Sequence, residues 1–204
     1  MTEVKIAAIV EGHGECEAVP ILIRRIALDI APNFVPKVLS PFRVPASRLS
    51  KEEELERTVV LAANKLQARG GIVIIIDCDD GCPAQDGPAL LKRAVAVRND
   101  IPISVIFAKR EFEAWFLAAA DSLRGRRGLP NNLKPPEYPE SIRGAKEWLS
   151  RQMPSGGSYK ETTDQPALTA LFDMSAARTA DSFDKCYRDV RQMLEKLYKI
   201  NYHQ

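Results

Sequence analysis

Three carboxylates end two apolar runs of this sequence. The run at residues 6–10 is followed by Glu11, and the run at residues 72–76 is followed by Asp77 and Asp79. Both runs are rich in β-branched residues, which is typical of buried strands in a parallel sheet. Side chains at i and i+2 of a strand point the same way, so Asp77 and Asp79 are predicted to face one site. Because Mg²⁺ and Mn²⁺ prefer carboxylate oxygens, the pattern predicts a divalent-cation site.

Strand and helix patterns alternate through the first two thirds of the chain, which positions these acids. Besides the two apolar runs, strands are predicted at 101–107 and at 34–44. The strand at 34–44 is weak, because its prolines confine it to an edge of the sheet or shorten it. Helices are predicted at 15–30, from Ser50 as an N-cap to residue 69, at 89–100 and at 109–123. Short connections between such elements predict an α/β fold, a parallel sheet flanked by helices on both faces.

The remaining third differs in composition. Residues 122–166 are rich in Pro, Gly and Arg, and a helical pattern follows at 166–198. We therefore predict a core at 1–121 and, at 122–204, an excursion and carboxy-terminal helices packed on that core, a single domain overall. The excursion, residues 122–166, is expected to be poorly packed and to border the acidic cleft.

Composition gives little guidance to a partner. The chain of 204 residues has 29 Lys and Arg against 27 Asp and Glu, a formal charge of +2. With no apolar run near ~20 residues and no secretion signal, we expect a cytoplasmic protein with reduced cysteines and no membrane contact. A zinc site of Cys16, Cys78, Cys82 and His13 stays an alternative, although the usual paired spacing is missing.

Further polar residues are expected around the three acids. Backbone N–H groups at Gly12 and Gly14 could face an anion, and Glu15 favours the positive end of the first helix. Asp80 adds an acid that is a ligand, a turn residue or a helix cap. These residues are accessory candidates.

Basic residues could contact phosphate. Lys109 and Arg110 follow the fourth strand at the same sheet edge, and Glu111 and Glu113 next to them are candidates for pairing or for the outer shell of a metal. The basic cluster Arg124, Arg126 and Arg127 is a candidate nucleic-acid contact. For both groups a solvated surface is the competing interpretation.

Two rival phosphate chemistries share these residues. The run at 77–81 resembles the Asp-x-Asp-Gly of haloacid-dehalogenase phosphatases, but it carries the inserted Asp80 and does not open the chain. The strand at 72–77 resembles a Walker B strand, yet no G-x4-GK[ST] motif is present, which argues against ATP hydrolysis by this chain alone.

The order of the acidic motifs resembles Toprim domains, in which one strand ends in Glu-Gly and a later strand ends in Asp-x-Asp. Within that superfamily the chain is similar to the bacterial group DUF4276. The matching motifs are Glu11-Gly12-His13-Gly14-Glu15, Asp77-Cys78-Asp79, Glu111-Phe112-Glu113-Ala114-Trp115, Tyr159-Lys160 and Ser182-Phe183. The similarity spans most of the chain.

The resemblance implies a Toprim-like α/β core with Glu11 as the acid-base residue and Asp77 and Asp79 as ligands of Mg²⁺ or Mn²⁺. Related Toprim proteins include primases, topoisomerases and overcoming-lysogenization-defect nucleases, which act on nucleic acid. No tyrosine matches a topoisomerase nucleophile, so hydrolysis or transfer using activated water fits better. Two hypotheses follow: a metal-dependent nuclease or phosphotransferase, and a non-catalytic module that binds a co-encoded ATPase, the partner that the resemblance suggests.

Overall fold

The computed structural model of the chain describes residues 3–49, 51, 53–67 and 69–198 and has the predicted α/β fold. Its sheet has five strands, and every strand pairing is parallel. The order is β2-β1-β4-β5, and β3 also pairs with β1. The strands are β1 (Lys5–Val10), β2 (Lys37–Val38), β3 (Phe42–Arg43), β4 (Gly70–Asp77) and β5 (Ile103–Ala108).

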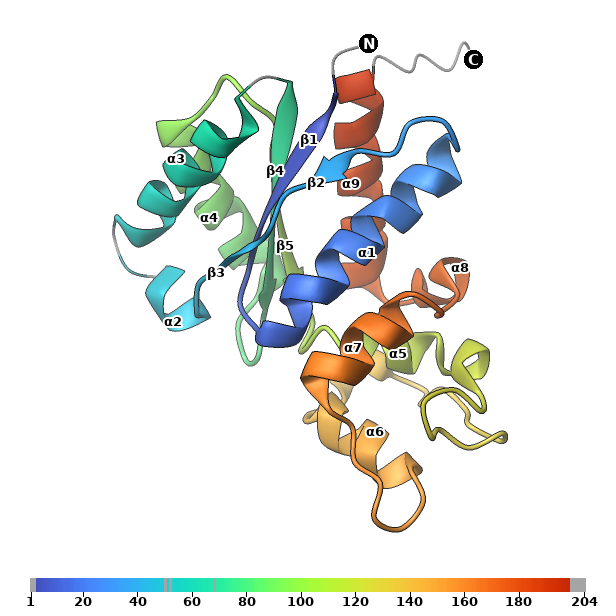
Figure 1. Cartoon of the computed structure of the whole chain (residues 1–204). Helices are drawn as coiled ribbons and strands as arrows, with labels where there is room; N and C mark the ends of the chain where they lie inside the picture. The colour runs from blue at the N-terminus through green and yellow to red at the C-terminus, as the bar shows by residue number, and fades with distance from the viewer. Residues whose placement is uncertain (1–2, 50, 52, 68, 199–204) are drawn as a thin grey trace.

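Helices cover both faces of this sheet (Figure 1). One face carries α3 and α4, and the other carries α1 and α9, while α6 and α7 lie beyond the end of the sheet at which α1 begins. The helices are α1 (His13–Ile30), α2 (Ala46–Leu49), α3 (Glu54–Leu66), α4 (Pro83–Val97), α5 (Ala114–Ala118), α6 (Ala145–Gln152), α7 (Glu161–Thr169), α8 (Met174–Ala177) and α9 (Asp181–Tyr198), with 3₁₀ turns η1 (Ala120–Leu123) and η2 (Pro139–Ser141).

The two central strands are buried on both faces, which explains their unbroken apolar sequence. Along β4, Val73 and Ile75 join the core beneath α1 and α9, whereas Ile72, Ile74 and Ile76 join the core beneath α3 and α4. Both faces of β4 therefore need apolar side chains, and the first polar side chain comes where the strand ends.

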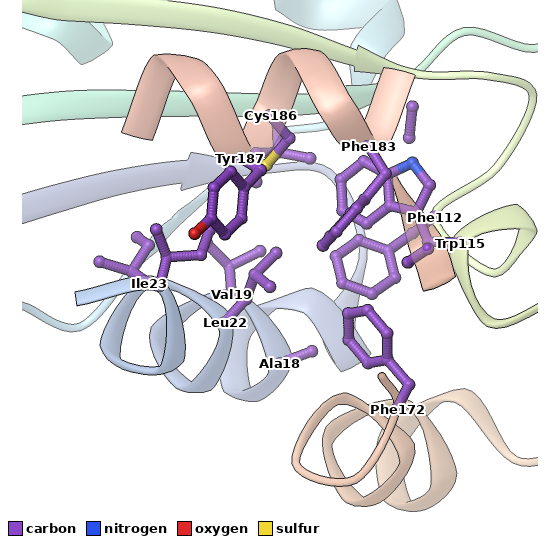
Figure 2. Packing of buried hydrophobic residues seen from close by; sticks show 14 of the residues in the cluster. Ala18, Val19, Leu22, Ile23, Phe112, Trp115, Phe172, Phe183, Cys186 and Tyr187 are labelled. Carbon is purple, nitrogen blue, oxygen red and sulfur yellow. The ribbon is translucent and has the colours of Figure 1, made fainter. Parts of the chain in front are cut away.

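An aromatic cluster joins the segment after β5 to α1 and α9 (Figure 2). Phe112, Trp115 and Phe116 are fully buried, as the helical spacing predicts. The Trp115 ring lies 5.2 Å from that of Phe183 in α9, and its indole N–H donates to Ser182 Oγ at 2.9 Å. These contacts fix the chain just beyond the carboxyl end of β5.

The prediction that the excursion is poorly packed is wrong. Leu129, Leu133, Leu149 and Tyr159 are buried in the same core as α1 and α9. Within the excursion, Glu161 of α7 accepts at Oε1 from the Gly14 N–H of α1 at 3.1 Å. The Pro and Gly content shortens the helices of this segment, but its apolar side chains are still buried in the core.

Other differences are local. The segment at 34–44 forms two edge strands instead of one, and α5 begins only at Ala114, because the chain at Arg110 binds the end of β4 through its carbonyl. The predicted N-cap Ser50 lies outside the described residues. Among the described residues, no helix is both long and apolar enough to cross a membrane.

Candidate functional site

Glu11 and Asp77 lie together at the carboxyl edge of the sheet. Asp77 ends β4, and Glu11 directly follows β1. In the parallel register Ile9 lies beside Ile74, so the two acids leave neighbouring strands at nearly the same level. Asp77 Oδ1 accepts a hydrogen bond from the Phe112 N–H at 2.9 Å. The segment after β5 therefore reaches the same edge.

Asp79 lies outside the strand. For Asp77 and Asp79 to face one site as predicted, β4 would have to continue to Asp79, but it ends at Asp77. Asp79 instead lies in a turn, with a left-handed φ of +46° and an exposed side chain. Its N–H donates to the Arg110 carbonyl at 3.0 Å. Asp79 still lines the same cavity as Asp77, which has a volume of about 430 Å³. The charge of Asp79 also raises the pKa of Glu11 by repulsion, although burial of the Glu11 carboxyl raises it more.

The amides at the start of α1 bind carboxylates of the chain itself. Glu15 Oε2 accepts from the N–H groups of Glu11 at 2.8 Å and Gly12 at 3.0 Å. Glu161 Oε1, from α7, accepts from the Gly14 N–H at 3.1 Å. The predicted anion position at this turn is thus filled by two glutamates, in agreement with the preference of helix N-termini for negative charge.

The excursion supplies a polar layer above the strand ends. Fully buried Glu113 accepts at Oε1 from the Tyr159 hydroxyl at 2.8 Å and from Gln165 Nε2 at 3.2 Å. Lys146 Nζ of α6 lies 3.2 Å from Glu161 Oε2. The excursion therefore borders the acidic residues, as the sequence predicted.

Burial raises the pKa of several acids in this cluster. It raises that of Glu11 and Glu15, raises that of Asp77 well above its ordinary value, and raises that of Glu113 to about 7. Repulsion from Glu15 and Glu113 adds to the effect at Asp77. The site thus holds more negative charge than its surroundings stabilise, and a proton or a cation relieves it.

Lys146 is a cation that faces this cluster. Burial alone would lower the pKa of its ammonium, but the carboxylates of Glu113, Asp77 and Glu161 raise it above the ordinary value. At neutral pH Lys146 is therefore charged and compensates part of the acidic charge.

Several buried polar atoms at the site have no hydrogen-bond partner among the described residues. They are Glu11 Oε2, Glu111 Oε2, Glu113 Oε2, Gln165 Oε1 and Arg110 Nε. Buried polar groups are almost always paired in folded proteins, so such a concentration indicates a place where water or a ligand binds.

The carboxylates fit a hydrated Mg²⁺ or Mn²⁺ better than a closed metal cage. Among the described residues there is no group of three or more His, Cys, Asp or Glu side chains that could hold a metal ion. The predicted alternative of a zinc site therefore has no support in the structure. Mg²⁺ commonly uses one or two carboxylates and completes its shell with water and substrate oxygens. Asp77 and Asp79 line one cavity, and the Asp79 charge acts on the carboxyl of Glu11, whose Oε2 has no partner among the described residues; these oxygens have the donor chemistry for such a site.

The predicted basic contacts divide into two groups. In the 124–127 loop, Arg126 is exposed, Arg124 pairs with Asp121, and Arg127 pairs with the buried Asp164 at 2.7 Å. Two of these three arginines therefore hold the excursion together.

The second basic group lies at the site. Arg110 NH1 binds Asp80 Oδ1 at 2.8 Å, and the backbone N–H of exposed Lys109 donates to Ser182 Oγ. Glu111 Oε1 accepts from the N–H groups of Gly144 and Ala145, where α6 begins. These residues link the end of β5 to the excursion.

Sequence reasoning missed Lys146, Glu161 and Gln165 as site residues. A signal was present for two of them, because Glu161 and Gln165 are four residues apart on one face of α7. Nothing in the sequence alone indicated that α7 lies against the start of α1.

That contact gives a test of the assembly. A Cβ at Gly14 would lie 2.6 Å from the Glu161 carbonyl oxygen, so Gly14→Ala should destabilise the protein by roughly 1–3 kcal/mol in urea unfolding. At Gly87, inside α4, the nearest atom would be 3.9 Å away, and Gly87→Ala should stabilise by roughly 0.5–1 kcal/mol. Equal effects of the two substitutions would contradict the packing of α7 on α1.

Fold and site together define an α/β protein whose parallel sheet carries a buried carboxylate cluster at its carboxyl edge. Residues 10–191 match the family model described as "Domain of unknown function (DUF4276)", and the chain belongs to this family. Comparisons with curated proteins and with solved structures gave no match.

Proposed function

We propose that the chain is a Toprim-type phosphodiester hydrolase or related phosphotransferase that acts on nucleic acid in the cytoplasm and depends on Mg²⁺ or Mn²⁺. The observation that carries the proposal is the buried, unpartnered Glu11 Oε2 beside Asp77 at adjacent strand ends. Ligands of open α/β sheets bind at this edge. A carboxylate with a purely structural role would have a hydrogen-bond partner for this buried oxygen as well.

Asp77 and Asp79, which line one cavity, are the residues that would hold the cation, and Glu11, the third predicted ligand, follows the neighbouring strand. Bound there, it would supply positive charge to the oxygens of the phosphate. The aromatic cluster around Phe112 keeps the Asp77 carboxylate in place, since the Phe112 amide donates to Asp77 Oδ1. The adjoining cavity of about 430 Å³ leaves room for part of a nucleotide beside Asp77 and Asp79.

Glu11 is the proposed general base. Its Oε2 takes the proton of a water whose oxygen bonds to phosphorus, while the bond from phosphorus to the leaving oxygen breaks and that oxygen takes a proton from solvent water. Burial raises the pKa of Glu11, which makes its carboxylate a better proton acceptor than an exposed one. Lys146 compensates charge nearby, because its ammonium faces Asp77 and Glu113.

The direct test is cleavage of single- and double-stranded DNA and RNA by purified protein with Mn²⁺ or Mg²⁺. We expect cleavage that stops in EDTA and in Asp77→Asn but continues in Asp100→Asn. Asp100 is an exposed acid before β5, at the opposite edge of the sheet. Cleavage that survives both EDTA and Asp77→Asn would contradict the proposed site.

Absence of cleavage, with the chain alone or with a co-encoded ATPase, would favour the alternative function. In that case the family resemblance suggests a binding module for the ATPase. Complex formation would then have the same affinity in Asp77→Asn and Asp79→Asn as in the unaltered chain.

A further inference from the structure

Two arginines from distant parts of the sequence share one carboxylate oxygen. Asp80 Oδ1 lies 2.8 Å from Arg110 NH1 and 2.6 Å from Arg143 NH1. Arg110 follows β5, whereas Arg143 belongs to the excursion, just before α6. Two guanidinium groups against one carboxylate leave a local excess of positive charge beside an otherwise acidic site.

Side-chain contacts position Arg110, and a backbone turn positions Arg143. Arg110 NH1 also donates to the Asp79 carbonyl at 3.0 Å, and Arg110 Nε is buried without a partner among the described residues. Arg143 precedes Gly144, whose φ of +68° is in the left-handed region and whose N–H is bound by Glu111. A glycine fits this turn without strain. The turn thus fixes the backbone beside Arg143, whose exposed side chain reaches Asp80.

The pair lies next to the proposed reaction centre. Asp79, whose carbonyl Arg110 binds, lines the cavity that also contains Asp77. Asp80 is the next residue, and its side chain is 69% exposed. An anion that binds the two guanidiniums in place of the Asp80 side chain would therefore lie next to Asp79, one of the proposed ligands.

We propose that Arg110 and Arg143 bind a phosphate that flanks the one to be cleaved, and that Asp80 occupies this position until nucleic acid displaces it. The inference rests on the proposed function. Guanidinium groups bind carboxylate and phosphate with the same geometry, so a phosphate can replace the exposed Asp80 carboxylate between Arg110 NH1 and Arg143 NH1. Because exposed ion pairs contribute little to stability, displacement of Asp80 costs little.

The test is binding of a fluorescent single-stranded DNA of 12 nucleotides in EDTA, followed by anisotropy at several salt concentrations. Arg143→Ala should weaken binding about five- to tenfold and reduce the salt slope by about 0.7. Asp80→Asn should tighten binding about three- to tenfold, because it removes the competing carboxylate. Thermal melts should show that all variants are folded.

Matched controls come from Arg98 and Asp100, which form the same kind of pair at the other edge of the sheet, 2.7 Å apart. Arg98→Ala and Asp100→Asn change the net charge equally but should leave affinity within about twofold. The inference is overturned if the two pairs of variants behave alike, or if the chain binds no DNA. Binding differences as expected without any cleavage would remove the hydrolase proposal and keep the phosphate site.

Discussion

Replacing Glu11 with Gln is expected to lower the rate of metal-dependent cleavage by about 10²–10⁴-fold, the usual contribution of a positioned base. Gln keeps the size of the side chain and one oxygen but cannot take a proton. The fold should therefore persist, and most cation binding should remain because Asp77 and Asp79 are unchanged. Single-turnover kinetics at saturating Mn²⁺ would measure the effect.

The pH profile adds a second readout for Glu11. Because burial raises its pKa, the acidic limb of the rate profile should lie above the ordinary value of 4.5, and it should vanish in Glu11→Gln. Glu17→Gln is the matched control, since Glu17 is an exposed glutamate of α1, the helix that begins two residues after Glu11. A rate loss below about tenfold in Glu11→Gln would assign proton transfer to another group.

Replacing Glu113 with Gln is expected to stabilise the protein at alkaline pH. Its folded pKa of about 7 exceeds the ordinary 4.5, so the folded state holds a proton more tightly than the unfolded chain. Stability from this group is therefore present below pH 4.5 and is lost as the pH rises towards 7. The difference corresponds to roughly 3 kcal/mol, an upper limit because Lys146 loses a partner in the variant.

Urea unfolding of both proteins at pH 5 and pH 8 measures this effect. Gln can still accept from Tyr159 and Gln165 through its side-chain oxygen, so the two proteins should differ little at pH 5. At pH 8 Glu113→Gln should be the more stable. A difference that does not change with pH would show that Glu113 is not held with an elevated pKa.

The sequence was sufficient for the sheet and for its acidic ends. The apolar runs before Glu11 and Asp77 are continuous because β1 and β4 are covered on both faces, and that pattern distinguishes them from amphipathic strands. Parallel strand order then brings the two acids to one edge. The aromatic residues from Phe112 to Phe116 were likewise predictable as core from their spacing.

The conformation of Asp79 could not be predicted from alternation. Side chains alternate only while the strand continues, and β4 ends at Asp77. The N–H groups of the next two residues, Cys78 and Asp79, donate to the Arg110 carbonyl. The contacts of the excursion were harder still to predict. Its contacts with the site, through Tyr159 and Glu161, join residues more than ~45 positions apart, and no local periodicity encodes such pairings.

Binding of Mn²⁺ at pH 7.5, measured by electron paramagnetic resonance or calorimetry, tests the central claim most directly. The account predicts that the unaltered chain binds the ion, that Glu11→Gln keeps most of this binding, and that Asp77→Asn weakens it at least about tenfold. Equal affinity in Asp77→Asn and the unaltered chain, or no binding by either, would contradict the proposal of a divalent-cation site at the carboxyl edge of the sheet.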